Sequence, residues 1–123
     1  MITLKELNPR NRPLTHDQEA NLELLHKAIN KVRTAYGKPM VVTSGFRSVE
    51  DQQRINPKAS ASKHLLGLAV DIADADGKLW AWCVANLSVI EEAGLYLEDG
   101  ASTKGWVHFQ ASPPKSGRRI FKP

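Results

Sequence analysis

The chain has 123 residues, of which 41% are hydrophobic and 24% charged, and its formal net charge is +4. This length and balance are typical of one soluble globular domain, which we expect to span residues 1–123. The apolar runs are far shorter than the roughly 20 residues that cross a bilayer, and the N-terminus lacks the pattern of a secretory signal. We therefore expect no stable membrane insertion and synthesis in a cytoplasm without a signal peptide. The single cysteine, Cys83, excludes an intrachain disulfide and a multi-cysteine zinc cluster.

The residue pattern in chain order predicts a small α+β domain. Thr15 and Gln18 are typical of a helix start, and apolar residues then repeat at helical spacing as far as Tyr36. The remaining predicted elements are a strand at 40–44, a short helix at 48–55, a loop at 56–63, a strand at 68–73, a helix at 78–93, and a hairpin of strands 94–98 and 106–110. This order predicts a small antiparallel sheet packed with helices, with the tail wrapping over the body.

Alternation along two of these strands places ionisable side chains on one sheet face. In LAVDIA (68–73), Asp71 lies between two alanines on the face opposite the large apolar residues. In WVHFQ (106–110), His108 shares its face with Trp106 and Gln110. Small neighbours leave room beside a carboxylate, so we expect a cleft on this face.

A metal ion would explain this arrangement if the two strands are neighbours. Asp71 and His108 would then point into the same cleft, and His64 would enter from the preceding loop. Two imidazoles and one carboxylate form the protein ligand set of a catalytic zinc ion, with a fourth position left to water. A cation also offsets the cost of burying Asp71. The alternative is two hydrogen-bonded histidines and an aspartate paired with an arginine.

Three blocks of sequence resemble a known family. SKHLLGLAVDI begins at Ser62 and fits Ser-x-His-x-x-Gly-x-Ala-x-Asp, with TSGFRS (43–48) upstream and GWVHFQ (105–110) downstream. Together they resemble the zinc peptidase family of D-alanyl-D-alanine carboxypeptidases and phage L-alanyl-D-glutamate endopeptidases. The resemblance runs from about Val41 to Gln110. It implies a Zn²⁺ ion held by His64, Asp71 and His108 in a cleft on one sheet face.

The same resemblance assigns two substrate-binding residues. The substrate-anchoring arginine of the family corresponds to Arg47, and its serine corresponds to Ser62. Arg47 offers a planar fork of donors that suits a carboxylate, a peptide carbonyl or the oxyanion that forms during hydrolysis. The alternative for Arg47 is a surface ion pair with Glu50 or Asp51.

The general base departs from the family pattern. Members commonly carry an acid, or in some cases a histidine, a few residues before the last zinc histidine. Here Gly105 and Thr103 stand three and five residues before His108, and neither can accept a proton from water. The nearest acids are Glu98 and Asp99, which are the two candidate catalytic bases.

The register of the hairpin bears on that choice. If Tyr96 pairs with His108, Glu98 pairs with Trp106 and shares the zinc-facing side. The alternative for both acids is a solvated acidic turn.

The resemblance implies an enzyme that hydrolyses peptide bonds of the bacterial peptidoglycan stem peptide or cross-link. The short chain without a wall anchor is more similar to a phage or prophage endolysin than to a secreted carboxypeptidase. We expect a monomer that is made in the host cytoplasm and acts on the wall after release. The alternative is a non-catalytic, metal-containing module that binds the cell wall or belongs to a virion. A nucleic-acid partner is not expected, because the aromatic residues lie in core-like patterns rather than among lysines and arginines.

Overall fold

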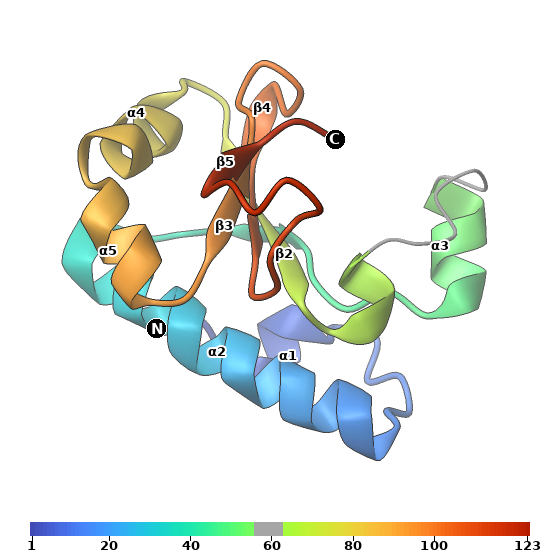
Figure 1. The fold of residues 1–123 in the computed structure, drawn as a ribbon. Helices are drawn as coiled ribbons and strands as arrows, with labels where there is room; N and C mark the ends of the chain where they lie inside the picture. Colours follow the sequence, from blue (N-terminus) through green and yellow to red (C-terminus); the bar gives the residue numbers. More distant parts are fainter. Residues whose placement is uncertain (56–62) are drawn as a thin grey trace.

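The computed structural model describes residues 1–55 and 63–123, and helices surround a central sheet in it (Figure 1). The helices are α1 (Leu4–Leu7), α2 (His16–Tyr36), α3 (Val49–Ile55), the 3-10 helix η1 (Lys63–Leu66), α4 (Lys78–Ala85) and α5 (Leu87–Glu92). The strands are β1 (Val42–Ser44), β2 (Ala69–Asp74), β3 (Tyr96–Glu98), β4 (Gly105–Gln110) and β5 (Ile120–Phe121). Within the described residues, no helix has both the length and the apolar character needed to cross a membrane.

The five strands form one sheet in the order β1-β2-β4-β3-β5. The pairs β1–β2, β2–β4 and β4–β3 are antiparallel, and β5 pairs parallel with β3. The predicted α+β fold with a small antiparallel sheet is therefore confirmed, with one parallel pair at the edge. The tail was expected only to wrap over the body, but Ile120 lies opposite Leu97 and extends the sheet.

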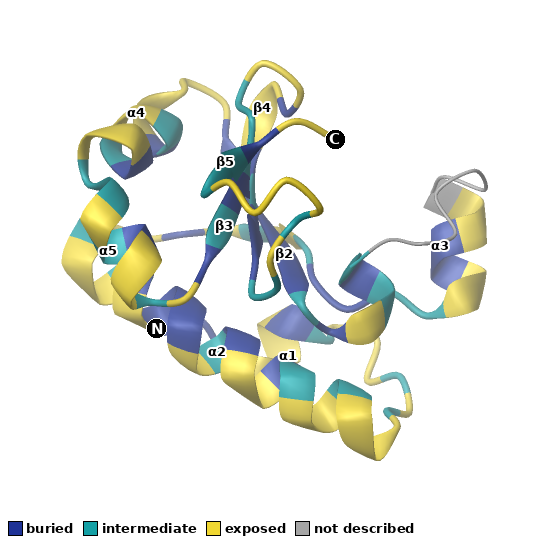
Figure 2. Cartoon of the chain, in the orientation of Figure 1, coloured by how far each residue is buried: buried dark blue, intermediate teal, exposed yellow. Residues whose placement is uncertain are grey.

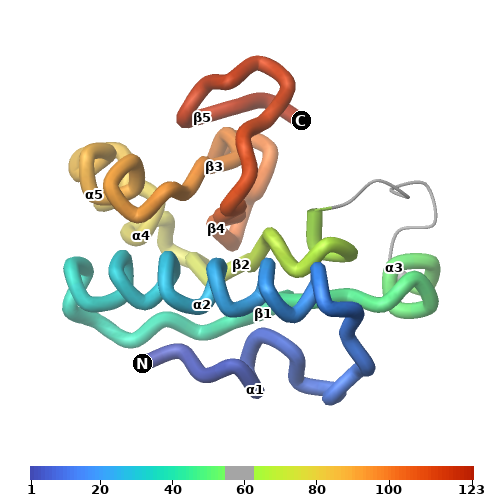
Figure 3. Tube along the Cα trace, turned by 60° about the horizontal axis from the view of Figure 1, so that its bottom comes forward, coloured from blue at the N-terminus to red at the C-terminus, as the bar shows by residue number. Residues whose placement is uncertain are grey.

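One face of the sheet packs against α2, which lies along the sheet in Figure 3. The buried side of α2 contributes Leu25, Ile29 and Val32 to the same core as Ile72 of β2 and Phe109 of β4. Figure 2 shows α2 with its opposite side exposed. Burying one such side chain stabilises the fold by about 1.5–3 kcal/mol. The packing of these side chains therefore fixes α2 against this face of the sheet.

The helix predicted at 78–93 is two helices. At Asn86 the backbone leaves the helical region, with φ −124° and ψ 42°, and the Asn86 side chain donates to the Trp82 carbonyl. Asparagine competes for backbone hydrogen bonds in this way, so it ends α4 and allows α5 to start in a new direction.

A turn at residues 75–77 joins β2 to α4 and fixes the start of that helix. Gly77 has φ 74°, which favours glycine. The Asp74 carboxylate accepts hydrogen bonds from the backbone N–H groups of Leu79 and Trp80, each at 2.9 Å. The acidic turn therefore caps a helix and joins β2 to α4.

Candidate metal centre

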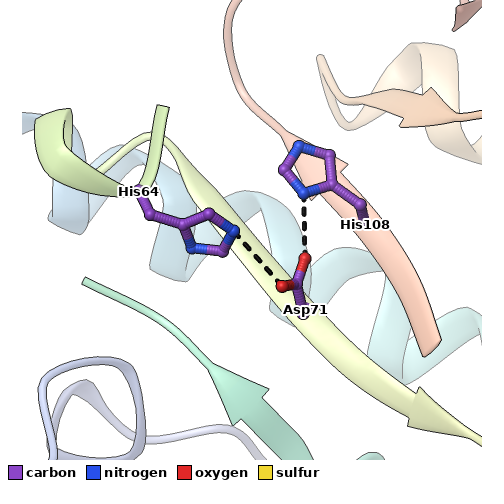
Figure 4. Close-up of side chains that lie close together, drawn as sticks. All are labelled: His64, Asp71 and His108. Atoms are coloured by element: carbon purple, nitrogen blue, oxygen red, sulfur yellow. Dashed lines mark hydrogen bonds and ion pairs between the residues drawn. The ribbon is translucent and has the colours of Figure 1, made fainter. Parts of the chain in front are cut away.

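Three side chains meet on the sheet face opposite α2. The strands β2 and β4 are neighbours, as predicted, and Asp71 pairs directly with His108 in their register. His64 lies in η1, which immediately precedes β2. Figure 4 shows the three side chains pointing toward one another from these three elements.

The distances within this cluster are short. His64 Nε2 lies 3.3 Å from Asp71 Oδ2, and His108 Nδ1 lies 2.9 Å from Asp71 Oδ1. One ligand atom from each residue lies within 4.8 Å of the other two. His64 and Asp71 are buried and His108 is half-buried. The sequence prediction that these residues converge is met, and their role as metal ligands remains a prediction.

Hydrogen bonds behind the two rings set which nitrogen faces the centre. His64 Nδ1 contacts the Gly45 carbonyl oxygen at 2.8 Å, and a carbonyl only accepts, so Nδ1 carries the proton. His108 Nε2 contacts Gln110 Oε1 at 3.0 Å, and the Gln110 amide is oriented by its N–H donation to the Ser112 carbonyl. His108 Nε2 is therefore also the protonated nitrogen of the neutral ring.

It follows that neutral His64 and His108 both direct lone pairs at the Asp71 carboxylate. Two nitrogen lone pairs and a carboxylate facing one another are all acceptors, and they need a cation or additional protons between them. A divalent metal ion satisfies all three groups together, and hydrogen-bonded outer partners of this kind orient metal-binding histidines. The residues present therefore fit a metal ion.

Without a metal, protons take that place and shift the pKa values. Burial raises the pKa of Asp71, but hydrogen bonds from His108 and His64 outweigh it and hold this pKa well below 3.8. Burial lowers the pKa of His108, but the hydrogen bond to Asp71 and its negative charge outweigh burial and raise that pKa above 6.5. The centre thus favours positive charge beside Asp71.

Arg47 borders the cluster. Its Nη2 lies 3.6 Å from Asp71 Oδ2, while Nε donates to Ser44 Oγ at 2.8 Å and Nη1 donates to Gln52 Oε1 at 3.1 Å. The guanidinium is therefore held in a fixed orientation beside the cluster of His64, Asp71 and His108. No ion pair joins it to Glu50 or Asp51 among the described residues, so that alternative is wrong.

Glu98 ends β3 on the same sheet face as His108. The ladder pairs Tyr96 with Gln110 and Leu97 with Phe109, so the next position places Glu98 opposite His108. The hairpin register considered from the sequence is therefore wrong by two residues. An even shift keeps Glu98 on the same face and brings it closer to the cluster.

Asp99 lies just beyond the strand and takes a different role. Its carboxylate accepts from the Ala101 N–H at 3.1 Å, and its carbonyl accepts from the Ser102 N–H at 2.9 Å. These contacts form the turn that follows Glu98, the last residue of β3. Burial raises the pKa of Glu98, partly opposed by the charge of His108, and Asp71 raises it further.

Sequence reasoning overlooked Gln110 and Gly45 as partners of the histidine rings. The signal for Gln110 was present, because alternation places it on the face of His108. Gly45 carried no such signal, since it binds His64 across 19 residues through its backbone carbonyl. Ser62, which the family resemblance assigns to substrate binding, lies outside the described residues.

The comparisons with known proteins agree with this geometry. Residues 2–110 match the family model described as Peptidase M15. The chain belongs to the Peptidase M15 family. The resemblance inferred from the three sequence blocks is thereby confirmed, and M15 membership makes the protein a metallopeptidase.

One solved structure is also similar to this chain. The crystal structure of the L-Ala D-Glu endopeptidase ChiX of Serratia marcescens aligns with a TM-score of 0.51 and 26% sequence identity. The alignment covers 86% of this M15 chain and 95% of that chain. The comparison with curated proteins finds no match.

Proposed function

We propose that this M15 protein is a zinc-dependent endopeptidase that cleaves the stem peptide of bacterial peptidoglycan. The observation that carries the proposal is the convergence of His64, Asp71 and His108 with both histidine lone pairs directed inward. Two imidazoles and a carboxylate match the three-ligand set of a catalytic zinc site. Family membership supports hydrolysis of a peptide bond.

The metal and the residues around it divide the chemistry. When bound, zinc supplies a Lewis acid that acidifies water and polarises a carbonyl group. Arg47, fixed by Ser44 and Gln52, directs its guanidinium toward the centre, where it binds the substrate carbonyl or the negative charge that develops on its oxygen.

Glu98 is the proposed general base. It is half-buried on the face of His108, so its carboxylate can accept a proton from the attacking water and return it to the leaving amine. Asp99 is the less favoured candidate, because its carboxylate already accepts a backbone hydrogen bond in the turn. This base replaces the acid that family members commonly carry shortly before the last zinc histidine.

The proposed scissile bond is L-alanyl-D-glutamate. Support comes from the similarity to the Serratia L-Ala D-Glu endopeptidase across most of both chains. A carboxypeptidase acting on terminal D-alanine is the other activity suggested by the sequence resemblance. A lytic role in a phage or prophage remains a prediction from that resemblance.

One observation favours a second candidate function. Gly105 and Thr103 stand at the positions before His108 where a base is common, so the chain could retain a metal centre without catalysis. Such a protein would be a wall-binding or virion-associated module. Its affinity for peptidoglycan would be measurable without any release of fragments.

Mass spectrometry of purified muropeptides distinguishes these functions. We expect the zinc-loaded protein to release L-alanine-terminated and D-glutamate-initiated fragments, and a chelator to stop the reaction until zinc is restored. Loss of terminal D-alanine alone would identify a carboxypeptidase. Binding without any new fragment would contradict the proposed enzyme and favour the module.

A further inference from the structure

A basic pocket lies beside the candidate metal centre. It has a volume of about 280 Å³ and lies where the segment after α1 meets the end of β1 and helix α3. Among the described residues that line it, the ionisable ones are Arg10, Arg47, Arg54 and Asp51. Three guanidinium groups and one carboxylate give the described part of this lining a net charge of +2, which favours an anionic ligand.

One arginine outside the lining is enough to neutralise Asp51. Arg12 donates to both carboxylate oxygens, from Nη2 to Oδ1 at 3.0 Å and from Nε to Oδ2 at 3.3 Å. Arg10 Nη1 approaches Oδ1 at 3.2 Å, and Arg54 also pairs with Oδ1. Asp51 therefore holds two more cations than its own charge requires.

The exposure of these side chains separates their roles. The Arg10 and Arg54 side chains are 55% and 59% exposed, whereas those of Arg12 and Asp51 are 32% and 8% exposed. The buried carboxylate thus anchors two accessible guanidinium groups at the pocket. Because their positions are set before binding, less side-chain entropy is lost when they contact a ligand.

The pocket is continuous with the metal centre through shared residues. Arg47 lines the pocket and also lies 3.6 Å from Asp71 Oδ2. Gly45 lines the pocket and accepts the hydrogen bond of His64 Nδ1. A ligand group in the pocket would therefore lie beside a peptide bond held at the metal centre.

We infer that this pocket is a subsite for a free carboxylate of an acidic peptide substrate, with Arg10 and Arg54 as the residues that recognise it. The inference rests on the proposed function and adds the charge of the substrate. A glutamyl residue linked to the next residue through one carboxyl group keeps the other as a free carboxylate. Guanidinium groups bind such a carboxylate through charge-assisted hydrogen bonds.

The test compares two peptides that differ only in that charge. One is L-alanyl-γ-D-glutamyl-L-lysine, and the other has the free glutamyl carboxylate converted to an amide. We expect the wild type to prefer the acidic peptide. Arg10→Gln and Arg54→Gln should each raise KM for the acidic peptide about threefold to tenfold, a modest change because partly exposed ion pairs are modest in strength. The kcat for the acidic peptide and the KM for the amide peptide should stay unchanged.

Three controls keep the result interpretable. Arg54→Lys retains the charge and should keep most of the preference. Lys31→Gln removes a positive charge from the exposed face of α2 and should change neither KM. Thermal unfolding should show that Arg10→Gln and Arg54→Gln remain folded, because Arg12 still pairs with Asp51.

A calorimetric titration separates failure of the subsite from failure of the proposed function. The ligands are γ-D-glutamyl-L-lysine and its amide, which lack the L-alanyl bond. Weaker binding of the acidic dipeptide to Arg10→Gln and Arg54→Gln supports the subsite even if neither tripeptide is cleaved. An absence of cleavage would contradict the proposed function alone. Equal affinity of the wild type for the acidic dipeptide and its amide would overturn the subsite. Equal losses of affinity for both ligands in the variants would overturn it as well.

Discussion

Substituting Gly45 by alanine tests how the fold orients the metal centre. A Cβ atom at this position would lie 2.3 Å from the Leu7 carbonyl oxygen and 2.8 Å from its carbonyl carbon, both backbone atoms. The neighbouring Phe46 N–H donates to the same Leu7 oxygen at 2.7 Å, so α1 and the end of β1 are tightly joined there. The backbone must therefore shift by several tenths of an ångström, because neither atom belongs to a flexible side chain.

Two effects of Gly45→Ala follow from that shift. Overpacking of this kind costs about 1–3 kcal/mol, which lowers Tm by roughly 3–15 °C in a domain of this size. The Gly45 carbonyl also holds His64 Nδ1, so we expect zinc affinity to fall about 10-fold to 100-fold. Thermal unfolding and zinc competition with a chromogenic chelator measure the two effects separately.

Gly117→Ala is the matched control for Gly45→Ala. Gly117 has φ 70° and open space around its Cβ position, so alanine there meets backbone strain without a steric clash. We expect about 1 kcal/mol of destabilisation and unchanged zinc affinity. A Gly45→Ala protein with the Tm and zinc affinity of the wild type would contradict both the tight packing of Gly45 against Leu7 and its role in orienting His64.

Three further predictions concern acidic residues. Glu98→Gln should lower kcat at least about 100-fold while zinc is retained, and Asp99→Asn should leave kcat near the wild-type value. Full wild-type activity in both variants would exclude Glu98 as the base. Burial raises the pKa of Asp51, but hydrogen bonds from its arginine and serine partners outweigh it and hold this pKa well below 3.8. The contribution of the ionised Asp51 to stability is therefore complete at neutral pH and is lost as the pH falls below about 4. In urea titrations, Asp51→Asn should lower the free energy of unfolding by about 1–2 kcal/mol at pH 7 and by less at pH 3. A pH-independent difference would contradict that assignment. In the same titration, Asp74→Ala should lower the free energy of unfolding by about 0.5–2 kcal/mol, because it removes the cap of α4. Asp76 is exposed, so Asp76→Ala should lower it by less. Equal decreases for the two variants would argue against the cap.

The positions of Asp71 and His108 could be predicted because they depend on a local rule. Side chains alternate along a strand, so the apolar residues of β2 and β4 define the core face and leave the acid and the imidazole on the other. The sheet pairing then places these two residues directly opposite each other. The fold class follows from the order of such local patterns along the chain and the family from three short blocks, and both are confirmed.

The remaining features depend on contacts that no local pattern encodes. The register of β3 on β4 differs by two residues from the one considered, and alternation along the strands fits both registers equally well. Strand β5 has only two residues, Ile120 and Phe121, too few for a sequence pattern to reveal, and it pairs with the edge of β3. The Asp51 cluster gathers arginines from both ends of a 45-residue stretch, from Arg10 to Arg54, and spacing alone cannot reveal it.

Zinc binding by the purified protein is the direct test of a metal site at His64, Asp71 and His108. After loading and dialysis, we expect about one zinc ion per wild-type chain and less than about a tenth of that in His108→Ala and Asp71→Asn, since each variant loses one of three ligands. Both variants should remain folded by circular dichroism. Equal zinc content in the wild type and both folded variants would contradict the proposed metal centre, as would a wild-type protein that binds no zinc.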